Sequence, residues 1–376
     1  MKIAVLKETD PLETRVSATP ETVKKFTALG ADMAVETDAG HAAGFSDADY
    51  AEAGATTADR AAVIDGADAI FCVRGPDPQD LSGAKSGVWL IGSLNPFGER
   101  ERVDAYANAD VEALAMEFMP RITRAQSMDI LSSQSNLAGY KAVLDACGEY
   151  GRAFPMMMTA AGTVSAARCF VMGVGVAGLQ AIATARRLGA QVSATDVRAA
   201  TKEQIESLGA KPIFVEDVEG IEGEGTGGYA TEMSEEYQKA QAELVSSHIA
   251  KQDVVITTAL IPGKPAPRLI SDAQIATMRA GSVIVDLAVE QGGNVEGAMP
   301  GEVVEKHGVK IVGHRNVPGR LASDASALFS RNLYNFLSAF WDEEAEKPVL
   351  PEDDEIVQGV TLTRGGEVVN ERLSAN

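Results

Sequence analysis

Cysteine, histidine and long apolar runs are all scarce in this sequence, and each shortage excludes a class of protein. The 376 residues include three cysteines and four histidines. Cys72, Cys147 and Cys169 are far apart and stand in apolar surroundings, so we expect reduced core residues and no disulfide framework. The histidines show no spacing typical of a metal site.

Positive charge is also in deficit, since 33 Lys and Arg oppose 54 Asp and Glu for a net charge of −21. That balance argues against binding to nucleic acid or to anionic lipid. The most apolar region, 153–185, is interrupted by Arg168 and by glycines, so we expect no membrane insertion. The apolar run at the start, 1–6, is too short for a signal peptide.

A glycine-rich turn is the strongest signal that the sequence does contain. Gly173, Gly175 and Gly178 form G-x-G-x-x-G between a strand-like run, 168–172, and a helix-like run, 176–188. The next apolar run ends at Asp196, 18 residues after the last glycine. This context is typical of a dinucleotide-binding βαβ unit, whereas the glycine pattern alone is weak.

Each position of this fingerprint has a physical task. The first glycine makes the turn, the second lets the backbone approach a pyrophosphate, and the third lets the helix pack on the strand. Asp196 can accept hydrogen bonds from the adenosine ribose, and its charge disfavours a 2′-phosphate, which predicts NAD(H) over NADP(H). Arg198 is compatible with a phosphate and leaves that choice open. The loops that follow later strands, 258–264 and 287–293, are expected to line the same cleft. The predicted nucleotide-binding residues are Gly173, Gly175, Val176, Ala177, Gly178, Asp196, Val197, Arg198, Leu260 and Gly263.

The rest of the chain alternates strand-like and helix-like segments, which predicts an α/β fold of two Rossmann-like domains with mostly parallel sheets. We expect a discontinuous first domain, 1–135 plus 316–376, and a nucleotide-binding domain, 136–315. Residues 342–355 hold eight acids and are expected to be a solvated linker, followed by a hairpin of 356–363 with 367–370. The acidic, glycine-rich segment 216–228 is expected to be a surface loop.

The polar segment 121–133 carries two Arg, a Gln, an Asp and three Ser. Composition alone favours a solvated loop there. A family resemblance assigns it a different role. The motifs that carry the resemblance are Lys2-Ile3-Ala4-Val5-Leu6-Lys7-Glu8, Arg15-Val16, the fingerprint, 260–267, and Asp286-Leu287-Ala288 with Gln291-Gly292-Gly293. Together they resemble the superfamily of alanine dehydrogenase and proton-translocating transhydrogenase, and the block 121–140 resembles the NAD(H)-binding component of the transhydrogenases.

The resemblance implies reversible hydride transfer between NADH on this chain and NADP+ on a partner subunit, coupled to proton movement. It implies a homodimer with the nucleotide in the interdomain cleft of each protomer. The implied partners are an NADP(H)-binding domain and a membrane proton-channel subunit. The implied location is cytoplasmic and peripheral, at the inner face of the bacterial cytoplasmic membrane.

Hydride transfer between two nicotinamides needs no proton acid or base, so the protein has to position the rings and exclude water. A nicotinamide carboxamide offers an acceptor oxygen and two N–H donors. The resemblance places Arg121, Gln126, Asp129 and Ser132 at this group, and it places Tyr229 on a loop that closes over the nucleotide.

Two other functions stay open at this stage. An alanine dehydrogenase of this superfamily uses an Arg, a Lys and a His in its first domain, and here Arg15, Arg74 and Ser93 stand at those positions. Without a group that titrates near neutral pH, oxidative deamination loses its proton chemistry, which favours the transhydrogenase. The second alternative is a sensor subunit that binds NAD without catalysis.

Overall fold

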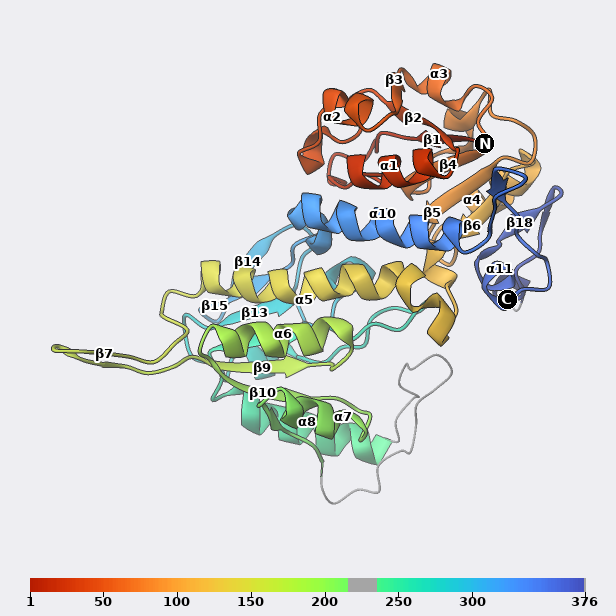
Figure 1. Cartoon of the computed structure of the whole chain (residues 1–376). Helices are drawn as coiled ribbons and strands as arrows, with labels where there is room; N and C mark the ends of the chain where they lie inside the picture. Colours follow the sequence, from red (N-terminus) through yellow and green to blue (C-terminus); the bar gives the residue numbers. More distant parts are fainter. Residues whose placement is uncertain (216–234, 375–376) are drawn as a thin grey trace. The chain divides into compact units, whose positions relative to one another are not determined.

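The computed structural model describes residues 1–215 and 235–374 (Figure 1). The chain forms two compact units. Unit 1 comprises Met1–Gln134 and Gly319–Asn376, and unit 2 comprises Ser135–Pro318. Each unit is built around its own sheet of mainly parallel strands, as the alternation of apolar runs and helices predicts.

Unit 1 contains a six-stranded sheet in the order β3-β2-β1-β4-β5-β6, with every neighbouring pair parallel. Its strands are β1 (Lys2–Val5), β2 (Asp32–Glu36), β3 (Thr56–Ala58), β4 (Ala69–Arg74), β5 (Trp89–Ser93) and β6 (Glu112–Ala115). Its helices are α1 (Pro20–Ala28), α2 (Asp47–Glu52), α3 (Arg60–Ile64), α4 (Arg100–Asn108), α10 (Ala322–Ser338), α11 (Glu355–Val360) and α12 (Glu371–Ser374). Short 3-10 helices are η1 (His41–Ala43), η2 (Pro78–Leu81), η3 (Met116–Phe118), η4 (Thr123–Met128) and η6 (Val317–Leu321), the last of which crosses the boundary between the units.

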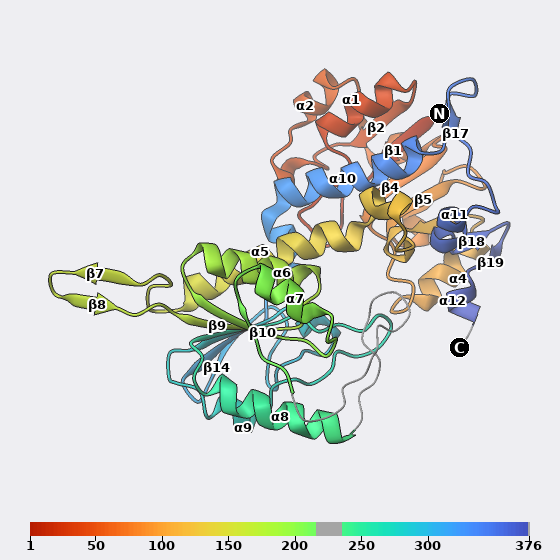
Figure 2. The same cartoon turned by 60° about the horizontal axis from the view of Figure 1, so that its bottom comes forward.

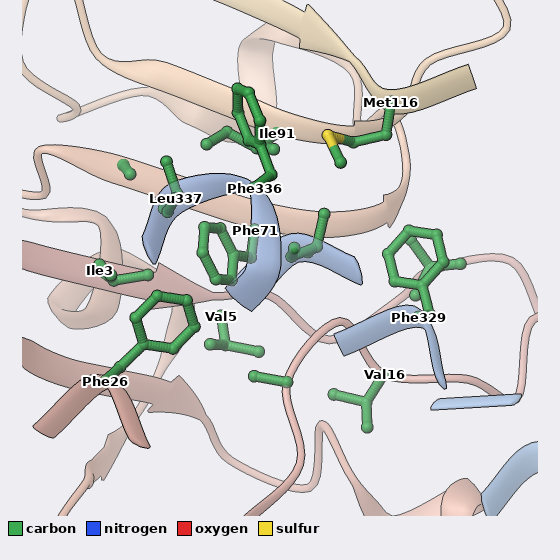
Figure 3. Packing of buried hydrophobic residues seen from close by; sticks show 14 of the residues in the cluster. Ile3, Val5, Val16, Phe26, Phe71, Ile91, Met116, Phe329, Phe336 and Leu337 are labelled. Carbon is green, nitrogen blue, oxygen red and sulfur yellow. The ribbon is translucent and has the colours of Figure 1, made fainter. Parts of the chain in front are cut away.

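The two faces of this sheet bury alternate residues of each strand. Ile3 and Val5 of β1 belong to one apolar cluster, whereas Ala4 belongs to the cluster on the opposite face. Helix α10 returns from the far end of the sequence to cover the first face, where Phe329 and Phe336 pack among residues of β1, β4 and α1 (Figure 3). Burial of each such ring contributes about 1.5–3 kcal/mol, which holds residues 319–376 to the N-terminal unit.

Unit 2 contains a seven-stranded sheet in the order β11-β10-β9-β12-β13-β15-β14, parallel except for the β14–β15 pair. Its strands are β9 (Arg168–Met172), β10 (Gln191–Thr195), β11 (Lys211–Pro212), β12 (Val254–Thr257), β13 (Val283–Asp286), β14 (Val303–Lys306) and β15 (Val309–Val312). Its helices are α6 (Val176–Arg187), α7 (Thr201–Ser207), α8 (Glu235–Ile249), α9 (Asp272–Ile275) and the 3-10 helix η5 (Val289–Gln291). Helix α5 (Ile130–Glu149) begins in unit 1 and continues into unit 2.

Strand β9 shows the same alternation, and it lies between β10 and β12 in the sheet. Cys169 and Val171 face one cluster, and Phe170 and Met172 face the other. A strand that is buried on both faces reads as a continuous apolar run, which is why the sequence identified it. Cys72 and Cys169 are buried and all three thiols are free, in agreement with the sequence-based expectation.

A two-stranded hairpin, β7 (Met157–Thr159) with β8 (Gly162–Val164), was not predicted from the sequence. It extends away from the sheet of unit 2 in both views (Figure 2). Met156, Met157 and Met158 are 62%, 44% and 78% exposed. Three exposed methionines on one projecting hairpin are unusual for a surface that faces only water.

Three sequence-based predictions at the edges of elements need correction. Residues 355–360 are a helix, because the Asp354 carboxylate accepts from the backbone N–H of Ile356 and Val357 and caps its first turn. The terminal hairpin is therefore short, β18 (Thr363–Arg364) with β19 (Glu367–Val368). The acidic segment 342–355 contributes to a small hairpin, β16 (Trp341–Asp342) with β17 (Lys347–Pro348), and the strand predicted at 212–215 pairs only through β11. Within the described residues, no helix combines the length and the apolarity that a membrane span requires.

Candidate functional site

The turn between β9 and α6 shows why glycine stands at two of its three fingerprint positions. Gly173 has a φ of 97°, a left-handed conformation that favours glycine, and a Cβ there would lie 2.6 Å from Thr258 Oγ1. A Cβ on Gly178 would lie 1.9 Å from the Gly173 carbonyl oxygen, so a side chain at 178 cannot coexist with this turn. The third glycine therefore lets α6 begin directly against the turn, as the fingerprint predicts.

Gly175 differs from these two, because an added Cβ would meet no atom within 4 Å. It is the N-cap of α6, and no described side chain caps that helix end. The first backbone N–H groups of a helix have no partner within the helix, and the helix dipole adds partial positive charge there. Open space in front of uncapped amides fits the pyrophosphate of a dinucleotide.

Asp196 follows β10 and lies against the same turn. Its Oδ2 accepts from Val174 N at 2.7 Å, and its two oxygens accept from Arg198 Nε and Nη2 at 2.9 and 3.0 Å. Burial raises the pKa of this carboxyl, but the Arg198 and backbone hydrogen bonds outweigh burial and the pKa is lowered. The acid is therefore ionised at neutral pH. Val197 and Arg198, also predicted to contact the nucleotide, lie beside it and are half-buried.

A second loop meets the turn from β12. Thr258 Oγ1 donates to the Gly173 carbonyl at 3.0 Å, and the side chain of Asn294 hydrogen-bonds both the N–H and the C=O of Ala259, at 3.0 and 2.9 Å. Leu260 and Gly263, predicted to contact the nucleotide, are exposed on this loop. Thr258 and Asn294 were missed in the sequence because neither belongs to the glycine pattern.

Asp286 and Gly139 hold the surroundings of the turn in place. The buried Asp286 carboxylate accepts from Ala288 N and Val295 N, which shapes the loop after β13, and burial raises its pKa. Gly139 lets α5 approach α6 closely, since a Cβ there would lie 2.0 Å from the Ala177 carbonyl oxygen. The glycine of the Asn136-Leu137-Ala138-Gly139-Tyr140 block thus has a packing role.

In unit 1 the segment 121–133 is more ordered than its composition suggests. It contains η4 and the first turn of α5, and Ala125 and Met128 are buried in the core. Asn332 and Asn335 of α10 donate to the Ser127 carbonyl at 2.8 and 3.0 Å, which fixes this 3-10 helix to unit 1. The expectation of a plain solvated loop was therefore wrong.

The four residues predicted at the nicotinamide are placed within this segment. Asp129 and Ser132 are half-buried and bonded to each other, because Asp129 accepts from Ser132 N at 3.0 Å and from Ser132 Oγ at 2.5 Å. Arg121 and Gln126 are exposed. Tyr229 lies outside the described residues. The described chain contains no cluster of His, Cys, Asp or Glu that could hold a metal ion.

A buried charge cluster in unit 1 was not anticipated. The Glu13 side chain is 0% exposed and accepts from Arg15 Nε and Nη2, both at 2.7 Å, and from Arg74 Nε at 2.9 Å. Arg15 Nη1 donates to Gln134 Oε1 at 2.8 Å. At the end of β5, Ser93 Oγ donates to the buried Glu117 at 3.3 Å. The three positions that a dehydrogenase of this superfamily uses are thus tied into the protein's own carboxylates.

Comparison with known proteins agrees with these features. Residues 4–138 match the family described as Alanine dehydrogenase/PNT, N-terminal domain, and residues 142–371 match Alanine dehydrogenase/PNT, C-terminal domain. The chain is 54% identical to the first of the two polypeptides named as NAD(P) transhydrogenase subunit alpha in Rhodospirillum rubrum, over 100% of this chain and 99% of that protein. The crystal structure of transhydrogenase from Sinorhizobium meliloti superposes with a TM-score of 0.89 at 54% identity, covering 98% of this chain and 100% of that one.

Alanine dehydrogenases are more distant relatives. The alanine dehydrogenase of Halomonas elongata is 29% identical over 97% of this chain and 94% of that protein. The glycine turn, the parallel sheets and the sequence matches along almost the whole chain lead to one assignment: the chain belongs to the alanine dehydrogenase/PNT family, with transhydrogenase alpha subunits as much nearer relatives than alanine dehydrogenases.

Proposed function

We propose that this chain is the NAD(H)-binding component of a proton-translocating transhydrogenase, in which hydride passes directly between NADH on this chain and NADP+ on a partner subunit. The observation that carries the proposal is the open, uncapped N-terminus of α6 at Gly175, beside the ionised Asp196, in a chain 54% identical to a transhydrogenase alpha subunit. The bound nicotinamide supplies the hydride donor and acceptor chemistry.

The chain's own residues then have binding and orienting tasks. The amides at the start of α6 bind the pyrophosphate and Asp196 binds the adenosine ribose. Arg121 and Gln126 donate to the carboxamide oxygen of the nicotinamide. The Asp129–Ser132 pair accepts from the carboxamide nitrogen, with the Ser132 hydroxyl oriented by its bond to Asp129. Tyr229 closes over the nucleotide in this proposal. No step requires a proton acid or base.

The same argument separates this reaction from alanine dehydrogenation. Oxidative deamination needs a proton carrier and a cation for the substrate carboxylate. Ser93 does not titrate near neutral pH, and Arg74 is paired with Glu13 and Asp10. Incubation with NADH, pyruvate and ammonia should give no alanine. Incubation with an NAD analogue and the purified NADP(H)-binding partner domain should give hydride transfer, and a failure there would favour the sensor alternative.

Gln126→Asn tests the nicotinamide-positioning role. The amide is kept but retracted by one methylene, so the carboxamide should be less well oriented. We expect the affinity for NADH to change little and hydride transfer to the partner domain to slow by roughly 10- to 100-fold. Rates are measured by single-turnover absorbance. Ser127→Ala, which changes the adjacent exposed side chain and keeps the carbonyl that Asn332 binds, should react at the wild-type rate. An unchanged rate in Gln126→Asn would refute the role.

We also propose that two copies form a homodimer through the β7–β8 hairpin. Its exposed Met156, Met157 and Met158 give a projecting apolar surface that a second copy of the chain would bury. The component would attach to the inner face of the cytoplasmic membrane only through its partner subunits, among them the proton channel.

Met158→Asp should therefore dissociate the dimer. A carboxylate in the buried centre of an apolar contact loses hydration without gaining a partner, so we expect the dissociation constant to rise at least about 100-fold. Sedimentation velocity across a dilution series measures it. Met299→Asp is the matched control, since Met299 is also an exposed methionine of unit 2, at 48%, but lies away from the hairpin in the sequence. Equal sedimentation of the two variants would contradict the hairpin interface.

A further inference from the structure

The Asp196 carboxylate is already saturated by donors from its own chain. Oδ1 accepts from Arg198 N and Arg198 Nε, both at 2.9 Å, and Oδ2 accepts from Val174 N at 2.7 Å and Arg198 Nη2 at 3.0 Å. A carboxylate offers about four lone-pair positions. A ribose hydroxyl therefore finds no acceptor position on this acid while the guanidinium stays in place.

The four donors differ in their freedom to move. Val174 N belongs to the glycine turn, and the backbone at Arg198 is fixed because its carbonyl accepts from Thr201 N at 3.1 Å and Thr201 Oγ1 at 2.7 Å. The other two donors lie at the end of the flexible Arg198 side chain, which is 18% exposed. Only the guanidinium can leave without disturbing the turn or the start of α7.

We propose that Arg198 is a specificity-determining residue whose guanidinium competes with the adenosine ribose for Asp196 and leaves the carboxylate when the nucleotide binds. The exchange is balanced, since two ribose hydroxyls replace two N–H donors, one on each oxygen. The inference rests on the proposed NAD(H) site and identifies what sets its affinity.

The displaced guanidinium has a second effect. It is tethered two residues from Asp196 and remains close to the ribose, where a 2′-phosphate would stand in NADP(H). A cation there offsets the repulsion between that phosphate and Asp196. Arg198 therefore weakens NAD(H) binding and supports the residual binding of NADP(H), which accounts for an acid and a base placed two positions apart.

Arg198→Met separates these effects, because it removes the guanidinium and keeps the backbone N–H that Asp196 accepts. We expect the Kd for NADH to fall about tenfold, which corresponds to the loss of one strong charge-assisted competitor. The ratio of the Kd for NADPH to the Kd for NADH should rise. Nucleotide fluorescence titration at constant ionic strength measures both values. Arg198→Lys, which keeps the charge but not the two-pronged contact, should give intermediate values for NADH.

Two controls keep the test sharp. Lys202→Met removes a nearby positive charge, one that lies over the Phe214 ring, and should leave the Kd for NADH within about twofold of wild type. In Arg198→Ala, millimolar guanidinium chloride should weaken NADH binding more than the same concentration of sodium chloride does. If the wild-type chain does not bind NADH, the proposed function fails. If the wild type binds and Arg198→Met binds NADH equally or more weakly, the competition is refuted while the proposed function stands.

Discussion

Gly178→Ala should abolish NADH binding and lower the stability of unit 2. The new methyl carbon would lie 1.9 Å from the Gly173 carbonyl oxygen, far inside contact distance, and both atoms belong to the same short turn. The turn has to open or α6 has to shift, at a cost of roughly 1–3 kcal/mol or more. Either movement displaces the amides that face the pyrophosphate, so we expect the affinity for NADH to fall at least about 100-fold by fluorescence titration.

Two other glycines make this result interpretable. Gly175→Ala adds a methyl group in open space, so the unit should fold normally and lose affinity only because the methyl group takes room needed by the ligand. Gly148→Ala lies on the exposed side of α5, also in open space, and should raise stability by up to about 1 kcal/mol without affecting NADH. Wild-type affinity in Gly175→Ala would show that the pyrophosphate does not bind at this helix end.

The sequence predicted the features of this site that depend on local backbone geometry. A left-handed turn, a close approach of helix to strand and an acid after the next strand each demand one residue type at one spacing, so Gly173, Gly178 and Asp196 were identifiable. The same reasoning located most strands, because strands buried on both faces need continuous apolar runs.

What the sequence could not supply depends on contacts between distant segments. Asn294 reaches Ala259 across 35 positions, and Glu13 pairs with Arg74 across 61. An isolated asparagine or glutamate has no pattern that reveals such a partner. The saturation of Asp196 by Arg198 is local, yet it was missed because the sequence gives residue spacing without side-chain direction. The capped helix 355–360 was missed because its apolar residues also fit a strand, and only the Asp354 bonds decide between them.

Glu13→Gln should produce the largest change in stability. The Glu13 side chain is fully buried, and Arg15, itself 9% exposed, depends on it for two side-chain bonds. Removing one partner of a buried pair leaves the other charge uncompensated, which typically costs about 3–5 kcal/mol. We expect a loss of about that size at pH 7. Both tryptophans, Trp89 and Trp341, lie in unit 1, so their fluorescence during urea unfolding reports on this unit.

The pH dependence of that loss is also determined. Burial raises the pKa of Glu13, but the hydrogen bonds and charge of Arg15 and Arg74 outweigh it and lower the pKa from 4.5 to about 2. A carboxyl whose pKa is lower in the folded state stabilises the fold above its unfolded pKa and loses that contribution as the pH falls to the folded value. Glu13 should thus contribute about 3 kcal/mol above pH 4.5 that is lost between pH 4.5 and about 2. The difference between wild type and Glu13→Gln should shrink over that interval.

Glu8 provides a control of opposite sign in the same cluster. Burial raises its pKa from 4.5 to about 7, although the backbone N–H groups of Val73 and Arg74 oppose the change. Its contribution is therefore complete below pH 4.5 and is lost as the pH rises through 7. Glu8→Gln should flatten the stability curve between pH 4.5 and 7 and leave the acid side as in wild type, whereas Glu13→Gln should flatten only the acid side. Parallel curves for wild type and Glu13→Gln between pH 4.5 and 2 would mean that Glu13 is not held ionised by Arg15 and Arg74.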